Sequence, residues 1–167
     1  MKVIKAPNDI AEARFDSTTI FLAGSIEMGK AEDWQGKTER LLSDYTDEQL
    51  TIYNPRRDDY NAEADQSIDD PYFSEQVNWE LDTQEASHYI FMYFHPDTKA
   101  PITLMELGLF ADQICKVIVC CPDGFWRQGN VEIVCDRFDI PFFRDYDEAL
   151  QHLRETIDFD QQIIRDD

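Results

Sequence analysis

Short apolar runs alternate with helix-like stretches along most of this chain, and that alternation restricts the folds that it can adopt. We expect strands at residues 18–23, 50–53, 88–94, 116–121 and 140–143. We expect helices at residues 32–45, 70–81, 101–111, 130–138 and 145–159. Such alternation with mostly short connections predicts a parallel sheet with helices on both faces. The predicted fold class is therefore α/β, a flavodoxin-like or Rossmann-like three-layer fold with a five-stranded, mainly parallel sheet.

The order of these strands decides where a ligand would bind. Five strands joined by helices favour the order 2-1-3-4-5, with its topological switch between the first and third strands. Val3 and Ile4 are candidates for a short additional edge strand. Because ligands of open α/β sheets bind beyond the carboxyl ends of the strands, we expect the loops after residues 23, 54 and 94 to line a site.

A single carboxylate interrupts the apolar, helix-like run Pro101–Ala111. Glu106 lies among Leu104, Met105 and Leu107, soon after the strand-like run 88–94. A carboxylate in such surroundings is costly to bury without a partner or a function. Acidic residues also favour the first turns of helices for ordinary electrostatic reasons. Both interpretations stay open on this run alone.

The charge balance excludes two classes of partner. The chain has 35 acidic and 15 basic side chains and a formal net charge of -20. Nucleic-acid affinity depends on Lys and Arg that neutralise phosphates, so a nucleic-acid polymer is not an expected partner. An anionic membrane surface is disfavoured for the same reason. Solubility is the simplest explanation of the acidity.

The chain length and the cysteines indicate the number of domains and the cellular location. The 167 residues are enough for one domain with a proper core, and we expect a single domain over residues 1–167. The first residues do not match a signal peptide, and no apolar run approaches a membrane span. Cys115, Cys120, Cys121 and Cys135 fit neither a zinc pattern nor a secreted disulfide framework, and they fall in apolar surroundings. We therefore expect a cytoplasmic, reducing location.

Several further groups could carry chemistry, each with a plain structural alternative. Gly24 and Ser25 end a strand and could let a ligand approach the backbone, or they could form a simple turn. Glu80 lies three residues after Val77, close to the stripe Phe73, Val77 and Leu81 that we expect to be buried, or it is an ordinary solvated helix residue. Arg56, after Asn54-Pro55, could meet a polar ligand or pair with nearby acids. The three histidines show no metal-ligand spacing.

Together these stretches resemble a known family. The chain is similar to nucleoside 2-deoxyribosyltransferases, closest to the nucleoside 2-deoxyribosyltransferase-like branch, over about residues 20–142. Six landmarks in one order carry the resemblance: Phe21-Leu-Ala-Gly-Ser-Ile26, Asp33-Trp34, Asn54-Pro-Arg-Arg57, Gln76-Val-Asn-Trp-Glu80, Met105-Glu-Leu-Gly108 and Gly129-Asn-Val131.

The resemblance implies roles for individual residues. Glu106 matches the nucleophile of the family, and Glu80 matches an acidic residue, usually Asp, that meets the leaving base. Asn130 matches an Asn that a neighbouring subunit lends to the sugar hydroxyls, which implies a homo-oligomer with shared active sites. The remaining substrate-binding residues implied by the landmarks are Gly24, Ser25, Trp34, Asn54 and Arg56.

One position departs from the family pattern. Characterised transferases often carry an Asp six residues before the nucleophile, and related deoxynucleoside-monophosphate hydrolases carry a Ser there for the phosphate. This chain has Ala100 at that position. Together with the net charge, the missing Ser favours nucleosides over nucleotides as substrates.

The expected activity is exchange of the base of a 2′-deoxyribonucleoside through a covalent glycosyl-Glu106 intermediate, without a metal or an organic cofactor. Nucleosides and free nucleobases are the expected small-molecule partners. Trp34, Tyr60, Tyr72 and Trp79 are candidates for a platform on which a base stacks, although each could equally be a packing aromatic. Two alternatives stay open: an N-glycoside hydrolase of deoxynucleosides or their monophosphates, and a non-catalytic nucleotide-sensing module.

Overall fold

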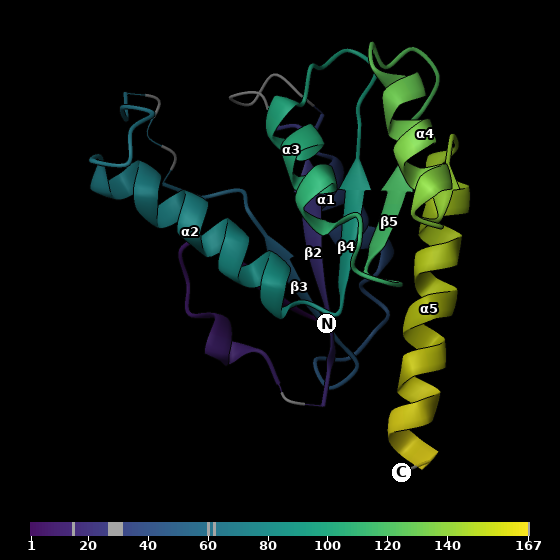
Figure 1. Ribbon diagram of the computed structural model, residues 1–167. Helices are drawn as coiled ribbons and strands as arrows, with labels where there is room; N and C mark the ends of the chain where they lie inside the picture. Colours follow the sequence, from purple (N-terminus) through teal and green to yellow (C-terminus); the bar gives the residue numbers. More distant parts are fainter. Residues whose placement is uncertain (15, 27–31, 60, 62, 167) are drawn as a thin grey trace.

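A computed structural model describes residues 1–14, 16–26, 32–59, 61 and 63–166 of the chain, and the side chains as far as residue 164. Strands and helices alternate along it (Figure 1). The elements are β1 (Lys2–Lys5), a short 3-10 helix (Ile10–Glu12), β2 (Thr18–Gly24), α1 (Trp34–Leu41), β3 (Leu50–Asn54), α2 (Pro71–Ala86), β4 (Tyr89–Tyr93), α3 (Pro101–Phe110), β5 (Val117–Cys120), α4 (Gln128–Arg137), β6 (Phe142–Phe143) and α5 (Tyr146–Asp166).

The sheet has the predicted fold class and strand order, with one strand more than the five expected. Its strands are ordered β1-β3-β2-β4-β5-β6, and all neighbours pair in parallel. The additional strand, β1, contains Val3 and Ile4 and pairs with β3 at the edge of the sheet. The central pair, β2 and β4, runs in register from Ile20 opposite Tyr89 to Gly24 opposite Tyr93. The topological switch therefore lies between β2 and β4, as predicted.

Alternate residues of each strand enter two separate hydrophobic clusters. On β2, Phe21 and Ala23 belong to the cluster shared with α2, α3 and α4, whereas Ile20 and Leu22 belong to the cluster shared with α1 and α5. Successive side chains of a strand point to opposite faces, so a strand that is covered on both faces must be apolar throughout. This requirement explains why the strands read as apolar runs in the sequence.

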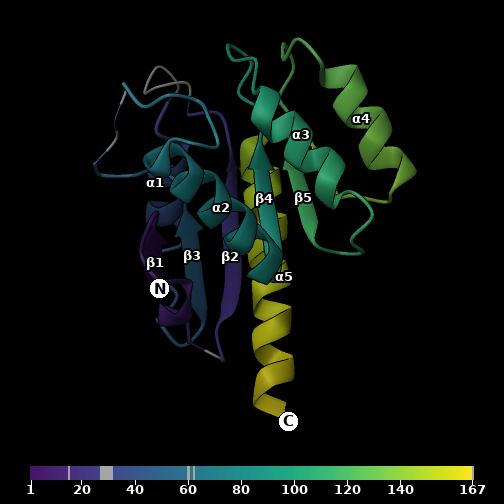
Figure 2. The ribbon, with the colours of Figure 1, turned by 60° about the vertical axis from the view of Figure 1, so that its left-hand side comes forward.

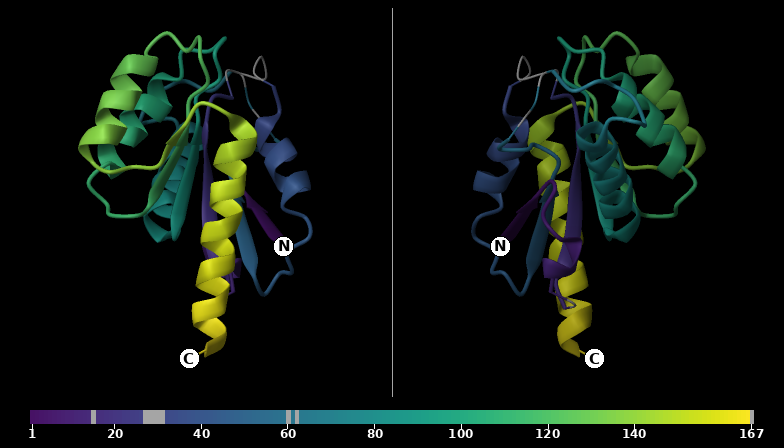
Figure 3. Two further views of the ribbon diagram at one scale, coloured as in Figure 1. Left: turned by 90° about the vertical axis from the view of Figure 1, so that its right-hand side faces the viewer. Right: turned by 90° about the vertical axis from the view of Figure 1, so that its left-hand side faces the viewer.

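The helices form one layer on each side of the sheet. Figure 2 shows α2, α3 and α4 in front of the strands and α5 behind them. The edge-on views of Figure 3 place α1 on the same side as α5. No helix within the described part of the chain is long and apolar enough to cross a membrane.

Helix ends follow local signals in one case and depart from the prediction in two others. Asp70 caps α2, because its side chain accepts from the N–H of Phe73, and Pro71 opens the helix. The helix expected to begin at residue 130 begins at Gln128 instead, so Asn130 lies in the first turn of α4 and does not cap it. The helix expected to end at residue 159 continues to Asp166 in α5.

Polar anchors account for the additional length of α5. Gln161 donates from Nε2 to Thr18 Oγ1 over 3.1 Å, and the Tyr89 hydroxyl donates to Asp160 over 3.0 Å. Both contacts hold α5 against the amino-terminal edge of the sheet, beyond which the helix projects (Figures 1 and 3). A sequence pattern that counts only apolar residues does not register such anchors.

Three of the four cysteines have the predicted apolar surroundings. Cys120, Cys121 and Cys135 are buried, and burial raises the pKa of each thiol to about 12, so the three thiols are neutral at physiological pH. Cys115 is exposed instead and adopts a left-handed backbone conformation.

Candidate functional site

A cavity of about 590 Å³ opens where α2, α3 and the loop after β3 meet. This volume lies in the usual range for small-molecule sites. The wall contains both predicted catalytic carboxylates, Glu80 and Glu106, and the predicted binding residue Arg56. The other lining residues are Ile26, Pro55, Arg57, Asn61, Ala64, Gln66, Tyr72, Phe73, Gln76, Val77, Leu81, Ile102 and Met105.

The middle of α3 carries Glu106, which lines this cavity. Ala100 precedes the helix in a left-handed conformation (φ 42°, ψ 51°), and Pro101 occupies the first helical position, where its missing N–H costs nothing. Glu106 follows on the buried side of α3 and is 5% exposed. Its Oε1 accepts a 2.7 Å hydrogen bond from Nε2 of Gln84 on α2. A neighbouring helix therefore fixes this carboxylate.

Glu80 comes from the middle of α2, one turn before Gln84. Its Oε1 accepts a 2.7 Å hydrogen bond from Nε2 of Gln76, one turn earlier. The same Gln76 nitrogen also donates to the carbonyl oxygen of Pro55 over 2.9 Å. Residues spaced by four lie on one face of a helix; of the three, Gln76 and Glu80 line the cavity, whereas Gln84 is fully buried.

Burial changes the protonation of both carboxyl groups. It raises the pKa of Glu80 to about 7, and the hydrogen bond from Gln76 opposes that increase. It also raises the pKa of Glu106 to about 7; the neighbouring negative charge of Glu80 adds to the increase, and the hydrogen bond from Gln84 opposes it. Because neighbouring carboxylates resist ionising together, the two groups together hold about one proton near pH 7. One group can then act as a nucleophile while the other acts as an acid.

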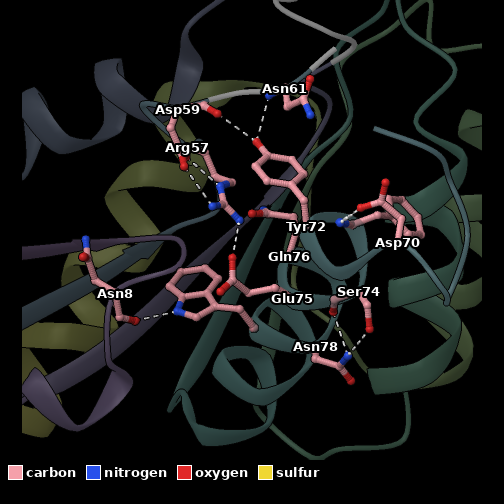
Figure 4. A network of polar contacts seen from close by, with 12 residues as sticks. Asn8, Arg57, Asp59, Asn61, Asp70, Tyr72, Ser74, Glu75, Gln76 and Asn78 are labelled. Atoms are coloured by element: carbon pink, nitrogen blue, oxygen red, sulfur yellow. Dashed lines mark hydrogen bonds and ion pairs between the residues drawn. The ribbon is translucent and has the colours of Figure 1, made fainter. Parts of the chain in front are cut away.

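Polar contacts connect α2 with the loop after β3 (Figure 4), and Arg57, Asn61 and Tyr72 of this network line the cavity. The guanidinium of Arg57 pairs with Asp59 at 2.8 Å and with Glu75 at 2.9 Å, and it lies 4.1 Å from the ring centre of Tyr72. The Tyr72 hydroxyl accepts from the N–H of Asn61 and donates to the carbonyl of Asp59. The Arg57 side chain is only 5% exposed, so its charge is held by the protein itself.

Arg56 lines the same cavity but is also held by its surroundings. Its Nε donates to Gln35 Oε1 over 2.9 Å and lies 3.5 Å from Asp33. Its Nη2 donates to the carbonyl oxygen of Glu32 over 3.2 Å. Arg56 is therefore paired with a nearby acid and also borders the cavity, and its contact with a polar ligand stays a prediction.

Gly24 and Ser25 lie at the end of β2 and do not line the cavity. A Cβ on Gly24 would come within 2.6 Å of the Trp34 ring and of the Tyr93 carbonyl, so close packing requires glycine there. The Ser25 hydroxyl is buried and forms a 2.7 Å hydrogen bond with Thr98. The next residue, Ile26, does reach the cavity wall. Gly24 and Ser25 therefore support the chain at the end of β2 and are not part of the cavity wall.

Trp34 and Asn54 are also embedded in the protein. Trp34 is 1% exposed and packs against Phe91 and Tyr93 on the α1/α5 side of the sheet. Asn54 is 2% exposed; its Nδ2 donates to Glu39 and its Oδ1 accepts from the N–H of Arg56. In this structure both residues support the loops around the cavity, and their predicted contact with a substrate stays a prediction.

Asn130 is exposed in the first turn of α4 and is not part of the cavity wall of its own chain. The helix α3 separates α4 from α2 (Figure 2). Side chains on the outer side of α3 are unusually apolar for a surface, with Ile102, Met105 and Leu109 each more than 50% exposed. Two of these, Ile102 and Met105, also line the cavity, so the apolar surface is continuous with the site.

The aromatic residues proposed as a stacking platform separate into different environments. Tyr72 lines the cavity, Trp79 is buried with its Nε1 donating to the Asn8 carbonyl over 2.7 Å, and Trp34 is in the opposite core. Tyr60 lies outside the described residues, as does the Glu27–Gly29 part of the glycine-containing loop after β2.

Sequence reasoning missed the two glutamines that hold the carboxylates. Gln76 and Gln84 are four residues before and after Glu80, a spacing that could have indicated a shared helix face. The stripe Phe73, Val77 and Leu81 was expected to face the core, but it faces the cavity and is only half-buried. The buried side of α2 is formed by Trp79, Thr83 and Gln84 instead.

Among the residues that the structure describes, no three His, Cys, Asp or Glu side chains form a group that could hold a metal ion. The polar side chains of the described cavity wall carry carboxyl, amide, guanidinium and hydroxyl groups.

Comparison with protein-family models identifies a family for most of the chain. The model described as "nucleoside 2-deoxyribosyltransferase like" matches residues 17–125, which include the cavity with Glu80 and Glu106. Asn130 and the helices α4 and α5 lie beyond the matched range. Comparison with curated proteins found no match at the significance required.

Proposed function

The chain belongs to the nucleoside 2-deoxyribosyltransferase-like family, and we propose that it exchanges the base of a 2′-deoxyribonucleoside through a covalent intermediate on Glu106. One observation carries the proposal: Glu106 and Glu80 line the same cavity, and burial raises the pKa of both to about 7. A pair that shares one proton supplies the nucleophile and the acid that cleavage of an N-glycosidic bond needs.

The first half of the reaction uses the two groups in different protonation states. A carboxylate oxygen of Glu106 forms a bond to the anomeric carbon of the sugar as the bond from that carbon to the base nitrogen breaks. The departing base takes the electron pair of the broken bond and a proton from Glu80. The transition state resembles an oxocarbenium ion, which the adjacent Glu106 carboxylate stabilises before it forms the covalent bond.

The second half reverses these steps with a different base. A nitrogen of the incoming base attacks the anomeric carbon, the bond to Glu106 breaks, and Glu106 leaves as a carboxylate. The proton that the incoming base loses returns to Glu80. Two displacements at one carbon retain the configuration of the sugar, as in retaining glycosidases.

The walls of the cavity favour a base over water in that second half. Phe73, Val77, Leu81 and Met105 present apolar side chains to the space beside the two carboxyl groups. An acceptor base that is held against these walls gains a large effective concentration relative to water. Tyr72 lines the same space and could offer one face of its ring to the base, since Arg57 covers the other.

Charge supports a nucleoside rather than a nucleotide as the substrate. The two cations of the cavity wall are already engaged: Arg56 lies beside Asp33, and Arg57 is paired with Asp59 and Glu75. Ala100, in the position where related monophosphate hydrolases carry a phosphate-binding Ser, is buried and has no hydroxyl. The net charge of -20 also disfavours the approach of a dianionic phosphate.

We also infer a cytoplasmic homo-oligomer in which Asn130 completes the site of a neighbouring copy. The exposed Ile102, Met105 and Leu109 support this inference, because an apolar surface of this kind often marks an interface. The interface would adjoin the cavity, since Ile102 and Met105 belong to both.

A product assay tests the proposed activity. The protein is incubated with deoxyinosine and an excess of adenine or cytosine, and the new nucleoside and the free sugar are both quantified. We expect the new nucleoside to form faster than free sugar, and slow sugar release when the acceptor base is omitted. Faster sugar release from a deoxynucleoside monophosphate at saturating acceptor would instead identify the alternative function, an N-glycoside hydrolase that uses the same Glu106. No turnover of any of these substrates would favour the non-catalytic alternative.

A further inference from the structure

Gln84 is buried on α2, outside the cavity wall, and contacts the proposed nucleophile directly. It is 0% exposed, and its Nε2 donates to Glu106 Oε1 over 2.7 Å. This is the one hydrogen bond that the described residues make to the Glu106 carboxylate. The orientation of the amide follows from its chemistry, because only the nitrogen can donate to an ionised carboxylate.

The other half of the same amide group has no partner. Among the described residues, no donor lies within hydrogen-bond distance of Gln84 Oε1, although the atom is buried. A buried acceptor without a partner costs free energy, so an apolar side chain of the same volume would suit the fold better. Packing therefore does not explain why a glutamine occupies this position. Within the described residues, its side chain forms one hydrogen bond, to Glu106.

We propose that Gln84 is a positioning residue that holds the carboxylate of Glu106 ionised and aimed at the anomeric carbon of the substrate. The proposal rests on the proposed function, in which Glu106 is the nucleophile. A hydrogen bond to the charged form of a carboxyl favours that form, and it also restricts the rotation of the carboxyl group.

The other charged groups around Glu106 do not perform this task. Glu80 faces it from α2 and disfavours its ionisation. Arg56 and Arg57 line the cavity from the loop after β3, but their guanidinium groups are directed to Asp33, Asp59 and Glu75. Within the described residues, Gln84 is thus the group that opposes the effects of burial and of Glu80.

Gln76 provides an internal comparison on the same helix. It donates to Glu80 over the same distance, 2.7 Å, and its Oε1 likewise has no partner among the described residues. Gln76 donates a hydrogen bond to the proposed acid, whereas Gln84 donates one to the proposed nucleophile. Removal of each amide should therefore change a different limb of the pH profile of kcat/KM.

The experiment compares Gln84→Met with Gln76→Met over pH 5 to 9. In Gln84→Met the ionised form of Glu106 is disfavoured, so we expect the acidic limb to move up by about one pH unit. A shift of that size lowers kcat/KM about tenfold below pH 6, with a smaller loss above pH 8. In Gln76→Met we expect the alkaline limb to move up instead, because protonated Glu80 loses a partner that favoured its ionised form.

Two further measurements distinguish a change in catalysis from misfolding of the variant. Thermal unfolding of Gln84→Met at pH 6 should occur at the wild-type temperature or above it, because the unpaired Oε1 is gone and Glu106 is neutral there. A second variant, Gln84→Glu, keeps the shape of the side chain but places a carboxyl against Glu106. It should move the acidic limb in the same direction as Gln84→Met and by at least as much.

The outcomes separate the two proposals. If Glu106→Gln keeps full exchange activity, the proposed function itself is wrong. If Glu106→Gln is inactive but both Gln84 variants keep the wild-type acidic limb, only the positioning role of Gln84 is wrong. A uniform loss at every pH in Gln84→Met, with a lowered melting temperature, would likewise assign Gln84 a structural role and overturn the inference.

Discussion

The two helical layers that cover the sheet use the same strands in different ways. On one face, α1 and α5 bury Trp34, Leu153 and Ile157, each no more than 1% exposed. On the other face, α2 slopes away from the sheet (Figure 1) and a cavity opens between it, α3 and the loop after β3. Two carboxyl groups line that cavity. The α1/α5 layer therefore contributes mainly packing, whereas the opposite layer is less tightly packed and contains a cavity lined by carboxyl groups.

The difference can be followed within α2 itself. Trp79 packs near Phe21 and Tyr53 of the sheet, as an ordinary core residue does. One position later, Glu80 points into the cavity, where burial raises its pKa. Gln76, which lines the cavity, and Gln84, which holds Glu106, each have a buried side-chain oxygen without a partner among the described residues. Locally unfavourable groups collect at functional sites, because a fold optimised only for stability would not keep them.

The largest effect should come from Glu106→Gln. This substitution removes the nucleophile but keeps the size and a polar end, so we expect base exchange to fall by about 10⁴-fold. Folding should be unharmed, because the change removes a charge that is costly to bury. Rates of nucleoside formation and thermal unfolding check both parts. The control is Glu85→Gln on the exposed side of α2, which should behave as wild type; equal activity of the two variants would contradict the assignment.

Trp34→Ala should show the opposite behaviour, since it belongs to the packed layer. Truncation of a fully buried aromatic residue lowers the free energy of unfolding by about 3–5 kcal/mol. The exposed Trp126, 52% accessible, gives a matched control in Trp126→Ala, whose effect on unfolding should be far smaller. Urea denaturation measures both. The milder Trp34→Phe tests the predicted substrate contact: an unchanged KM in this folded variant restricts Trp34 to packing.

Glu80→Gln should have an intermediate effect on catalysis. Loss of a general acid costs about 10²–10⁴-fold, and the loss should depend on the leaving base. A nucleoside with a good leaving group, such as a nitrophenyl deoxyriboside, needs little protonation and should recover most of the wild-type rate. Steady-state rates with the natural and the activated substrate test this. An equal loss with both substrates would mean that Glu80 does not act as the acid.

The two carboxyl groups should also make the stability of the protein depend on pH. Their pKa values are about 7 in the folded state and about 4.5 in model compounds, so the folded state holds more protons between these values. Stability must then fall as pH rises from about 4.5 to about 7, and it should change little from this source above that range. At about 1.4 kcal/mol for each pKa unit, this difference corresponds to about 3 kcal/mol per carboxyl at most.

Chemical denaturation at pH 5 and pH 8 measures this dependence. The double variant Glu80→Gln with Glu106→Gln should lose most of the difference between the two pH values, whereas the core variant Trp34→Phe should keep it. An unchanged pH dependence in the double variant would show that neither carboxyl group has a raised pKa in the folded protein.

The smallest effect concerns Asn130, which lies on the catalytic layer but outside the cavity of its own chain. Asn130→Ala should lower activity about tenfold by removing one hydrogen-bonding group from the site of a neighbour. Mixing Asn130→Ala with Glu106→Gln subunits should raise the activity above the sum of the separate proteins, because a mixed pair contains one complete site. Mixed oligomers that form without any gain in activity would contradict the shared site.

The sequence by itself determined the strand order and indicated that the loop after β3 borders a cavity, whereas the loop after residue 94, also expected there, contributes no described residue to the cavity wall. Apolar runs at the strands, Asp70 and Pro71 at the start of α2, and a lone Glu106 in an apolar helix are local signals. They suffice because parallel strands with helical crossovers bring their carboxyl ends to one edge. The resemblance to the family added Glu80, a residue that its own surroundings in the sequence did not distinguish from a solvated glutamate.

Only the tertiary structure decided which groups act together. Gln84 meets Glu106 because α2 and α3 come together over the sheet, a contact between residues 22 positions apart that no local pattern encodes. Trp34 lies in the opposite core, and the stripe Phe73, Val77 and Leu81 faces a cavity, although apolar spacing alone predicts the same burial for both. Periodicity records which residues share a face of a helix, but the packing of neighbouring elements decides what that face meets.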